Sequence, residues 1–281
     1  YPINGKPLIS IVIPNKDHVE DLRRCITSIE KKSTWKNYEI VVVENNSVEQ
    51  SIRDYYKELE SDPKVKIVTY EGGFNYSRIN NVGVKETKGE YLLFLNNDTE
   101  VISPDWMEQL LMYAQRKDVG AVGAKLYYAD NTIQHAGVVI GLGAHRSAGH
   151  THYKMPREHL GYMGRLCYAQ DVTAVTGACL MVKKSIYEEV DGLDESFTIS
   201  LNDVDLCLKI REKGYLNIFT PFAELYHYES KTRGMEEGEK LRRYERECAH
   251  FRDKWKEQLD AGDPYYNPNF SLDYSDFTLR F

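Results

Sequence analysis

The chain has 281 residues, of which 42% are hydrophobic and 28% charged, an ordinary composition for a globular protein with a sizeable core. Its 36 basic and 43 acidic side chains give a net charge of −7, which weighs against nucleic-acid binding because that function requires a basic surface. We expect neither a transmembrane segment nor a secretory signal, since no apolar run is long enough to span a bilayer.

The five cysteines are scattered, odd in number and without the Cys-x-x-Cys spacing of zinc sites. We therefore expect reduced thiols, no structural zinc and a cytosolic protein, with the inner face of the membrane as an alternative location. The chain begins at Tyr1 and not at Met, as would a domain cut from a longer polypeptide or a trimmed form of the protein.

Strands and helices alternate through the first half of the chain. Asp17 is expected to cap the first helix, whose apolar residues recur on one face. Strands that are separated by helices favour βαβ units and a parallel sheet. The expected strands cover residues 8–13, 39–43, 65–70 and 91–98, and the expected helices cover residues 19–32, 48–59 and 77–86.

The pattern becomes less regular after residue 119. Residues 137–152 are rich in Gly, His and Ser and predict a mobile loop. A short helix is expected over residues 203–213, with Asp203 near its start, and Trp106 is expected to pack in the core. Further strands are expected over residues 119–128, 172–182, 216–220 and 224–227.

The C-terminal part is different in character, because residues 235–259 are strongly charged and helical. An apolar stripe repeats every three or four residues along this helix. The helix either packs on its own domain or pairs with another subunit or a partner domain. An aromatic tail follows over residues 265–281, and the stripe consists of Leu241, Tyr244, Cys248, Phe251, Trp255 and Leu259.

Polar side chains follow three of the expected strands. Asp98 ends the apolar run that begins at Tyr91, and comparable polar groups follow the first two strands. Ligands of open α/β sheets bind outside the carboxyl ends of the strands. A carboxylate there can hold Mg²⁺ or Mn²⁺ together with substrate phosphates, although Asn-Asn-Asp-Thr is also good turn chemistry. Together the three strand ends favour a nucleotide site with a metal for the diphosphate.

Seven motifs in order along the chain resemble those of the family-2 glycosyltransferases, which have the GT-A fold. The resemblance covers residues 8–233 and is closest to bacterial enzymes of surface-polysaccharide and glycoprotein glycan synthesis. It implies an α/β fold with a mostly parallel, Rossmann-like sheet between helices. The motifs are IVIP (11–14), IVVVENNS (40–47), GEYLLFLNND (89–98), AVTGACLMV (174–182), GLDE (192–195), NDVDLCL (202–208) and YHYES (226–230).

We expect a transferase domain over residues 1–233 and a helical extension with a tail over residues 234–281. Within the first, residues 1–128 would bind the nucleotide and residues 129–233 the acceptor.

The resemblance implies roles for individual donor-site residues. Glu44 and Asn45 would contact the base or ribose, and Arg78 would contact the nucleotide, although a surface salt bridge would look the same. Asn96 replaces the first Asp of the family's Asp-x-Asp motif, so Asp98 is the one carboxylate left there for a metal. Further donor contacts are expected from Pro14, Asn15, Asn97, Thr176, Gly177 and Arg233.

Asp203 is the implied catalytic base, at the position where the family motif reads Glu-Asp and this chain reads Asn202-Asp203. Helix capping is the alternative role for this carboxylate. Asp205 would support the site, and His227 would ligate the metal, with a hydrogen-bonded loop histidine as its alternative.

Two more segments belong to the expected site. Gly177 would allow a close backbone approach near the sugar and acceptor. Ser230, Thr232 and Arg233 lie in a segment that in relatives closes over the diphosphate. A cluster of His145, His150 and His152 invites a metal interpretation, but a Gly-rich acceptor or lid loop is favoured.

The expected function is inverting transfer of a hexosyl or N-acetylhexosaminyl group from a nucleotide-diphosphate sugar to a glycan, glycoprotein or glycolipid acceptor. The donor would be a UDP sugar such as UDP-GlcNAc, UDP-Glc or UDP-Gal, with Mn²⁺ or Mg²⁺ as cofactor. The alternatives are a dTDP-rhamnose-dependent rhamnosyltransferase and a degenerate transferase that acts as a binding or scaffold subunit. A sugar nucleotidyltransferase is disfavoured because residues 8–17 contain no glycine.

Overall fold

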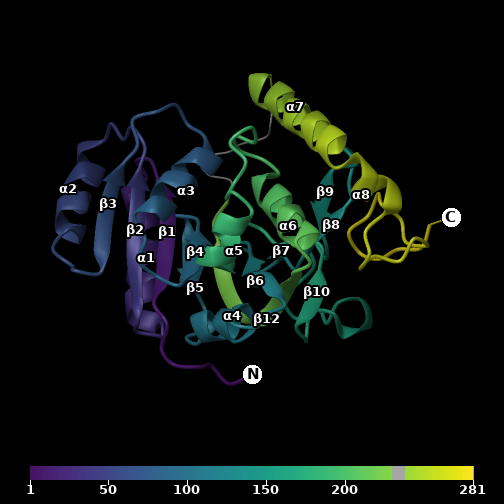
Figure 1. The fold of residues 1–281 in the computed structure, drawn as a ribbon, viewed down its shortest axis with the longest axis horizontal. Coiled ribbons are helices and arrows are strands. Elements are labelled where there is room, and N and C mark those ends of the chain that lie inside the picture. The colour runs from purple at the N-terminus through teal and green to yellow at the C-terminus, as the bar shows by residue number, and fades with distance from the viewer. Residues whose placement is uncertain (230–237, 281) are drawn as a thin grey trace.

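The computed structural model describes residues 1–229 and 238–280, and its ribbon is shown in Figure 1. Within these residues, ten strands form one mixed sheet in the order β10-β12-β6-β11-β4-β1-β2-β3, with β5 on β12 and β7 on β6. The strands are β1 (Ile9–Asn15), β2 (Tyr38–Glu44), β3 (Val65–Thr69), β4 (Tyr91–Leu95), β5 (Thr99–Val101), β6 (Val119–Tyr127), β7 (Ile133–His135), β10 (Gln170–Val172), β11 (Cys179–Lys183) and β12 (Leu216–His227).

The half of the sheet formed by β3, β2, β1 and β4 is parallel throughout, as the alternation of strands and helices predicted. The other half is mixed, because β11 runs antiparallel to both β4 and β6 whereas β12 and β6 are parallel. The carboxyl ends of β1 and β4 are neighbours, so the polar residues that follow them meet at one edge of the sheet.

Helices cover both faces of the sheet. In β1, Ile9, Ile11 and Ile13 face one core whereas Val12 faces the other, the alternation expected of a buried strand. The first core contains residues of α1 (Val19–Lys32), α2 (Gln50–Leu59) and α4 (Trp106–Ala114), and the second contains residues of α3 (Tyr76–Lys85), α5 (Lys184–Glu189), α6 (Asn202–Glu212) and α7 (Glu239–Lys254). The structure thus confirms the α/β class and the helices predicted in the first half.

Two predictions for the middle of the chain were wrong. Residues 137–152 form a hairpin of β8 (Val138–Ile140) and β9 (Ala148–His150), not an irregular loop. The hairpin packs on the C-terminal tail, where Val139 and Leu142 share an apolar cluster with Tyr266 and Phe277. Residues 172–182 are not one strand, because the chain turns between β10 and β11.

Smaller differences concern single residues and short elements. Asp17 does not cap α1, since its Oδ1 accepts hydrogen bonds from the backbone N–H groups of Val48 and Glu49, 2.8 and 3.0 Å away, just before α2. The strands predicted over residues 216–220 and 224–227 form the single strand β12, which has a register shift between them. Trp106 is fully buried as expected, in α4, a helix that the sequence analysis did not identify.

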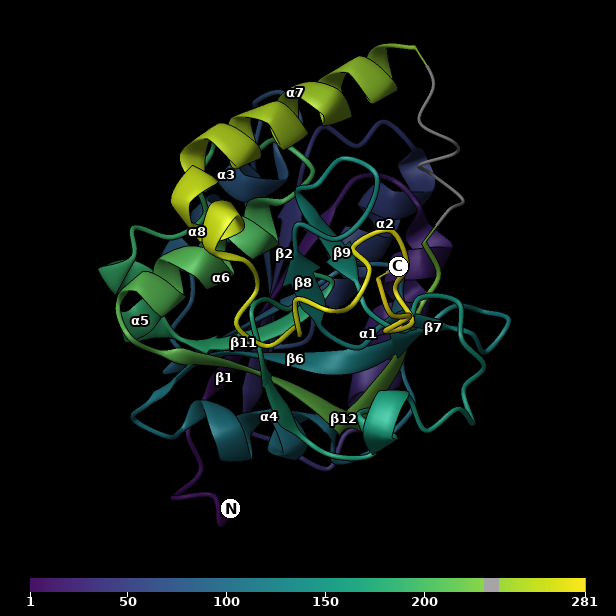
Figure 2. The same cartoon turned by 90° about the vertical axis from the view of Figure 1, so that its right-hand side faces the viewer.

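The charged C-terminal helix packs on its own chain. Cys248, Phe251 and Trp255 are buried, while Leu241 at the other end of the stripe is 37% exposed. Figures 1 and 2 show α7 running above α6, with α8 (Lys256–Ala261) continuing from its end. The buried part of the stripe therefore packs on its own domain, as in the first alternative, and pairing of this helix with a partner stays a prediction. Residues 235–237 of the expected helix lie outside the described residues. Among the helices that the structure describes, none has the length and apolarity to cross a bilayer.

Candidate active site

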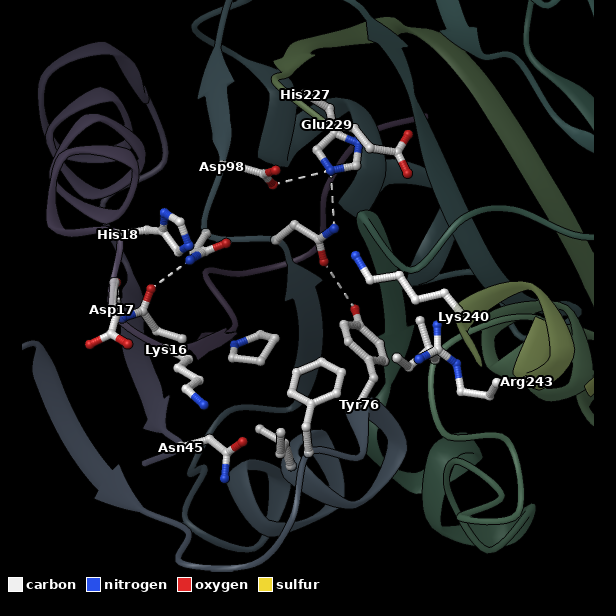
Figure 3. A pocket seen from close by; sticks show the side chains of 17 residues that line it. Lys16, Asp17, His18, Asn45, Tyr76, Asp98, His227, Glu229, Lys240 and Arg243 are labelled. Carbon is white, nitrogen blue, oxygen red and sulfur yellow. Dashed lines mark hydrogen bonds and ion pairs between the residues drawn. The ribbon is translucent and has the colours of Figure 1, made fainter. Parts of the chain in front are cut away.

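A cavity of about 390 Å³ opens at the carboxyl ends of the parallel strands; we call it the strand-end cavity (Figure 3). Its wall includes Pro14, Asn15, Asn45, Asn97 and Asp98, five residues that the sequence placed at a donor site. Asn97 Nδ2 donates to Asn15 Oδ1 over 2.6 Å, which joins the ends of β4 and β1. Asn45 Nδ2 donates to the carbonyl oxygens of Tyr70 and Gly72, so this amide also ties two loops together.

The two predicted metal ligands lie together in this cavity. His227 Nε2, at the end of β12, is 3.1 Å from Asp98 Oδ1, and both side chains are largely buried. The same ring nitrogen is 3.1 Å from Asn96 Nδ2. Asp98 and His227 are far apart in the sequence. They are brought together because β12 pairs with β5, the short strand that follows Asp98.

Hydrogen bonds around Gln134 decide which nitrogen of His227 carries the proton. Gln134 Nε2 donates to Glu229 Oε2 over 2.9 Å, so the amide oxygen of Gln134 faces the other way. That oxygen is 2.6 Å from His227 Nδ1, which must therefore be the protonated nitrogen that donates to it. With its single proton on Nδ1, the ring would present the lone pair of Nε2 toward Asp98, the arrangement found in metal-ligating histidines.

The residues present fit a divalent cation. A lone pair on Nε2 and a carboxylate oxygen 3.1 Å apart favour a cation between them. No group of three or more His, Cys, Asp or Glu side chains suited to a metal occurs among the described residues. Two protein ligands are nevertheless sufficient for Mg²⁺, which commonly completes its shell with water and substrate phosphate.

A second cavity, of about 330 Å³, adjoins the first; we call it the hairpin cavity because β8 and β9 contribute to its wall. Tyr76, Asn96, Ile199, His227 and Glu229 line both cavities and so separate them. The Tyr76 hydroxyl is 3.3 Å from Asn96 Oδ1 and 3.0 Å from the carbonyl oxygen of Gly177.

Asp203, the predicted base, lies on the wall of the hairpin cavity and is half-buried. Its Oδ2 accepts from the N–H of Gly177 over 2.8 Å and its Oδ1 from the N–H of Val204 over 2.8 Å. These two backbone donors fix the orientation of the carboxylate. A Cβ atom at position 177 would lie 3.2 Å from the Tyr76 hydroxyl and 3.4 Å from Asp203 Cβ, so the backbone of Gly177 is closely packed against both.

A match to the family model described as "Glycosyl transferase family 2" covers residues 10–191, more than half of the chain. The chain belongs to glycosyl transferase family 2. It is 47% identical to the uncharacterized protein y4gI of Sinorhizobium fredii over 99% of this chain and 31% of that protein. It is 36% identical to the O-antigen biosynthesis protein RfbC of Myxococcus xanthus over 100% of this chain and 22% of that protein. The chain thus spans at most about a third of these two relatives.

The fold agrees with that of a solved structure of low sequence identity. A crystal structure of GalNAc-T7 with UDP, GalNAc and Mn²⁺ matches with a TM-score of 0.70 over 90% of this chain and 49% of that chain, at 17% identity. At this identity the likeness supports the GT-A fold of the family-2 chain and nothing finer.

The turn that precedes Asp203 is fixed by α7, a role that the sequence analysis missed. Glu247 of α7 is 6% exposed, and its carboxylate accepts from the backbone N–H groups of Thr198, Ile199 and Ser200. Leu201 follows with φ 64°, a left-handed conformation that is unfavourable for a leucine. The hydrogen bonds to Glu247 thus stabilise a strained turn directly before α6.

Asp205 also connects α6 to α7. This carboxylate is fully buried, and its Oδ1 accepts from Trp255 Nε1 over 2.9 Å and from Lys254 Nζ over 2.6 Å. Lys254 also donates to Asp194 Oδ2 over 2.7 Å. Burial opposes ionisation of Asp194, but the hydrogen bonds from Lys254 and Ser196 outweigh it and hold the Asp194 pKa well below its usual range. This network ties the start of α6 to the end of α7, and the supporting role of Asp205 in the site stays a prediction.

Some predicted residues lie elsewhere. Arg78 is not among the described residues that line either cavity; its Nε is 2.6 Å from Glu195 Oε2, and both side chains are 40% exposed or more. Glu44 is likewise absent from both walls and accepts from the backbone N–H of Ser47. Thr176 and Gly177 line the hairpin cavity, not the strand-end cavity expected for donor contacts. Arg233, with Ser230 and Thr232, lies outside the described residues.

Other residues of the site had not been predicted. Lys240 and Arg243 of α7 point into the strand-end cavity opposite Lys16, Asp17 and His18 (Figure 3). The spacing of Lys240 and Arg243 on one helix face was visible in the sequence, but nothing local indicated where that face would lie. Glu229 belonged to a quoted motif, whereas Tyr76 and Gln134 gave no signal at all.

The histidine cluster also differs from the metal interpretation. His152 is buried, its Nε2 is 3.3 Å from the N–H of Tyr162, and burial lowers its pKa to about 3. His145 packs against Tyr244. His150 instead faces a partner that had not been considered, His135 of β7.

Proposed function

We propose that this chain is a metal-dependent inverting glycosyltransferase unit, which moves a sugar from a nucleotide-diphosphate donor to a hydroxyl group of a glycan acceptor. The observation that supports this most is the pair of adjoining cavities. Asp98 lies on the strand-end side, Asp203 lies on the hairpin side, and His227, Tyr76 and Asn96 line both cavities. The sugar would bridge the two cavities at this boundary.

In the proposed step, an acceptor hydroxyl oxygen in the hairpin cavity attacks C1 of the donor sugar. The bond from C1 to the diphosphate oxygen breaks, and the diphosphate leaves with the electron pair. Asp203 takes the hydroxyl proton, a contribution of typically ~10²–10⁴-fold for general-base catalysis. Attack from the face opposite the diphosphate gives a β linkage when the donor is α-linked.

The strand-end cavity would hold the nucleoside diphosphate. Asp98 and His227 would ligate Mn²⁺ or Mg²⁺, which when bound neutralises charge on the departing diphosphate. Lys16, Lys240 and Arg243 add cationic groups to the same wall, and a guanidinium is well matched to phosphate oxygens. Pro14, Asn15 and Asn45 would line the nucleoside part, whereas Glu44 and Arg78 would contact the donor only after a rearrangement.

We propose a UDP sugar as donor, and bacterial surface-glycan assembly as the setting because the chain is 36% identical to an O-antigen biosynthesis protein. The transferase unit would include residues 1–233, with residues 234–281 attached to it through α7. A location at the inner face of the membrane would suit a lipid-linked glycan acceptor.

The test is release of nucleoside diphosphate from a panel of UDP and dTDP sugars, with Mn²⁺, Mg²⁺ or EDTA. The wild type is compared with Asp98→Ala and with the exposed control Asp253→Asn. Metal-dependent release of UDP from one sugar, lost in Asp98→Ala and kept in the control, is the expected result. Release of dTDP would assign the rhamnosyl alternative. Binding of UDP without release from any donor, even with a mixed glycan acceptor pool, would favour the binding subunit.

A further inference from the structure

Two histidines meet at the wall of the hairpin cavity. His135 of β7 is fully buried, and its Nδ1 is 2.9 Å from Nδ1 of His150 in β9. The two rings are nearly perpendicular, at 87° with centroids 5.1 Å apart. His150 is half-buried and lines the cavity, on whose wall Asp203 also lies.

The partners of these rings indicate where their protons lie. A hydrogen bond between two Nδ1 atoms requires that one ring be protonated there and the other be bare. His135 Nε2 is buried and has no hydrogen-bond partner among the residues that the structure describes. An orphaned buried N–H is rarer than an under-satisfied buried acceptor. His135 is therefore best assigned its proton on Nδ1, which donates to His150.

This assignment gives His150 a defined role. Because its Nδ1 accepts from His135, the proton of the neutral His150 ring is on Nε2. Burial lowers the pKa of His135, and the charges of His150 and His227 add to this effect. Burial also lowers the pKa of His150, although the carboxylates of Asp203 and Glu229 oppose it, so both rings stay neutral near pH 7. His135 Nε2 belongs to the buried polar atoms that lack a hydrogen-bond partner within the described part of the chain, whereas His150 Nε2 does not. This difference fits a His150 ring whose Nε2 edge opens into the cavity.

The remaining wall suits an uncharged sugar. The described lining includes the carboxylates of Asp203 and Glu229 and no Lys or Arg, so an anionic group would meet like charge there. Tyr128 and Tyr153 add aromatic surface to the same wall, and their hydroxyl groups are 3.2 Å apart. Aromatic faces with a few placed polar groups are typical of sites that orient a small ligand.

We propose that the hairpin cavity binds an uncharged sugar residue of the acceptor, with His150 Nε2–H donating to one sugar oxygen and His135 holding His150 in that tautomer. His150 is thus a specificity-determining residue, and His135 a positioning residue that acts through it. This inference rests on the proposed function, because it identifies the class of acceptor for the same site.

The first arm of the experiment tests the tautomers directly. Long-range ¹H–¹⁵N spectra of the full chain with labelled histidine distinguish Nδ1–H from Nε2–H rings. The expected spectra show His135 protonated at Nδ1 and His150 protonated at Nε2 near pH 7, assigned through His135→Met and His150→Met. The reverse pair of tautomers, or a charged His150, would overturn the proposal.

The second arm uses methyl glycosides as probes on the complex with UDP and Mn²⁺. Methyl glucoside, galactoside and N-acetylglucosaminide are compared with methyl glucuronide and galacturonide, by calorimetry and by the shift of the His150 ring signal. At least one neutral glycoside should bind and move that signal. The affinity of the uronides should be lower by about tenfold or more. The proposal would be contradicted if the uronides bound as tightly as their neutral counterparts. It would also be contradicted if no neutral glycoside bound.

Variants separate this inference from the proposed function. His150→Met should weaken the neutral glycoside about tenfold, the effect of one lost hydrogen bond, and His150→Gln should restore most of the loss because it keeps an N–H donor. The exposed His159→Met is the control, and UDP affinity should be unchanged in all three. Wild-type glycoside affinity in His150→Met with UDP bound overturns the acceptor assignment alone, whereas failure of the wild type to bind any nucleoside diphosphate overturns the proposed function.

Discussion

The strand-end cavity and the hairpin cavity adjoin each other but are built in different ways. The first is formed largely by residues that end or closely follow parallel strands, such as Asn15 at the end of β1 and Asp98 after β4. The second gathers β7, the β8–β9 hairpin, the turn before α6 and the supports that α7 provides. The comparison teaches that a nucleotide site can follow from local strand-end chemistry, while an acceptor site depends on contacts between segments distant in sequence.

The largest expected effect is at Asp203, the proposed catalytic base in the hairpin cavity. Asp203→Asn keeps the size of the side chain but removes the proton acceptor, so turnover should fall by ~10²–10⁴-fold. UDP affinity, measured by calorimetry, should stay at the wild-type value because Asp203 lines the hairpin cavity and not the strand-end cavity. Asp253→Asn, an exposed change of the same chemistry on α7, should leave both quantities unchanged. Equal loss of UDP affinity and turnover in Asp203→Asn would contradict the assignment of separate roles to the two cavities.

The next effect concerns the fold that supports the hairpin cavity. Phe251 of α7 is fully buried, so Phe251→Ala should lower the free energy of unfolding by about 3–5 kcal/mol through lost burial and a cavity. Leu241 is 37% exposed, and Leu241→Ala should change it by about 0.5 kcal/mol or less. Denaturant unfolding measures both. A Phe251→Ala chain that keeps its stability but loses oligomer mass would show instead that the apolar stripe pairs with a partner.

The sequence predicted the parallel half well because its signals are local. A buried strand that ends in Asn96, Asn97 and Asp98 carries both its conformation and its chemistry within a few residues. Family motifs also led to Asp203 and His227, but not to Gln134, whose amide determines the tautomer of His227. Glu247 illustrates the limit most clearly, because a glutamate within a charged helix predicts solvent exposure, whereas here three backbone N–H groups surround it. Such contacts depend on how α7 docks, which no local pattern contains.

Glu247 allows a direct test of how α7 supports the turn. Glu247→Ala leaves the partly buried N–H groups of Thr198, Ile199 and Ser200 without their acceptor, which should cost about 1–3 kcal/mol of unfolding free energy. Turnover should fall as well, since the turn directly precedes Asp203, while UDP affinity should change little. Glu245→Ala, an exposed change on the same helix, is the control. An equally mild effect of both variants would mean that the turn keeps its conformation without α7.

The smallest of these effects concerns the strand-end cavity. There Gln134, which is distant in sequence from the strand ends, contacts His227. Gln134→Met removes the acceptor that holds the proton of His227 on Nδ1, so this proton can move to Nε2 and occupy the lone pair that faces Asp98. We expect Mn²⁺ affinity in the UDP complex to fall about 10–100-fold, the usual cost of losing such a supporting hydrogen bond. Electron paramagnetic resonance of free Mn²⁺ measures this change, and Gln50→Met, on the surface of α2, is the matched control. UDP affinity without metal should be the same in all three proteins. If Gln134→Met binds Mn²⁺ as the wild type does, Asp98 and the diphosphate hold the metal without His227. The metal site would then depend only on residues at the strand ends, as the sequence suggests.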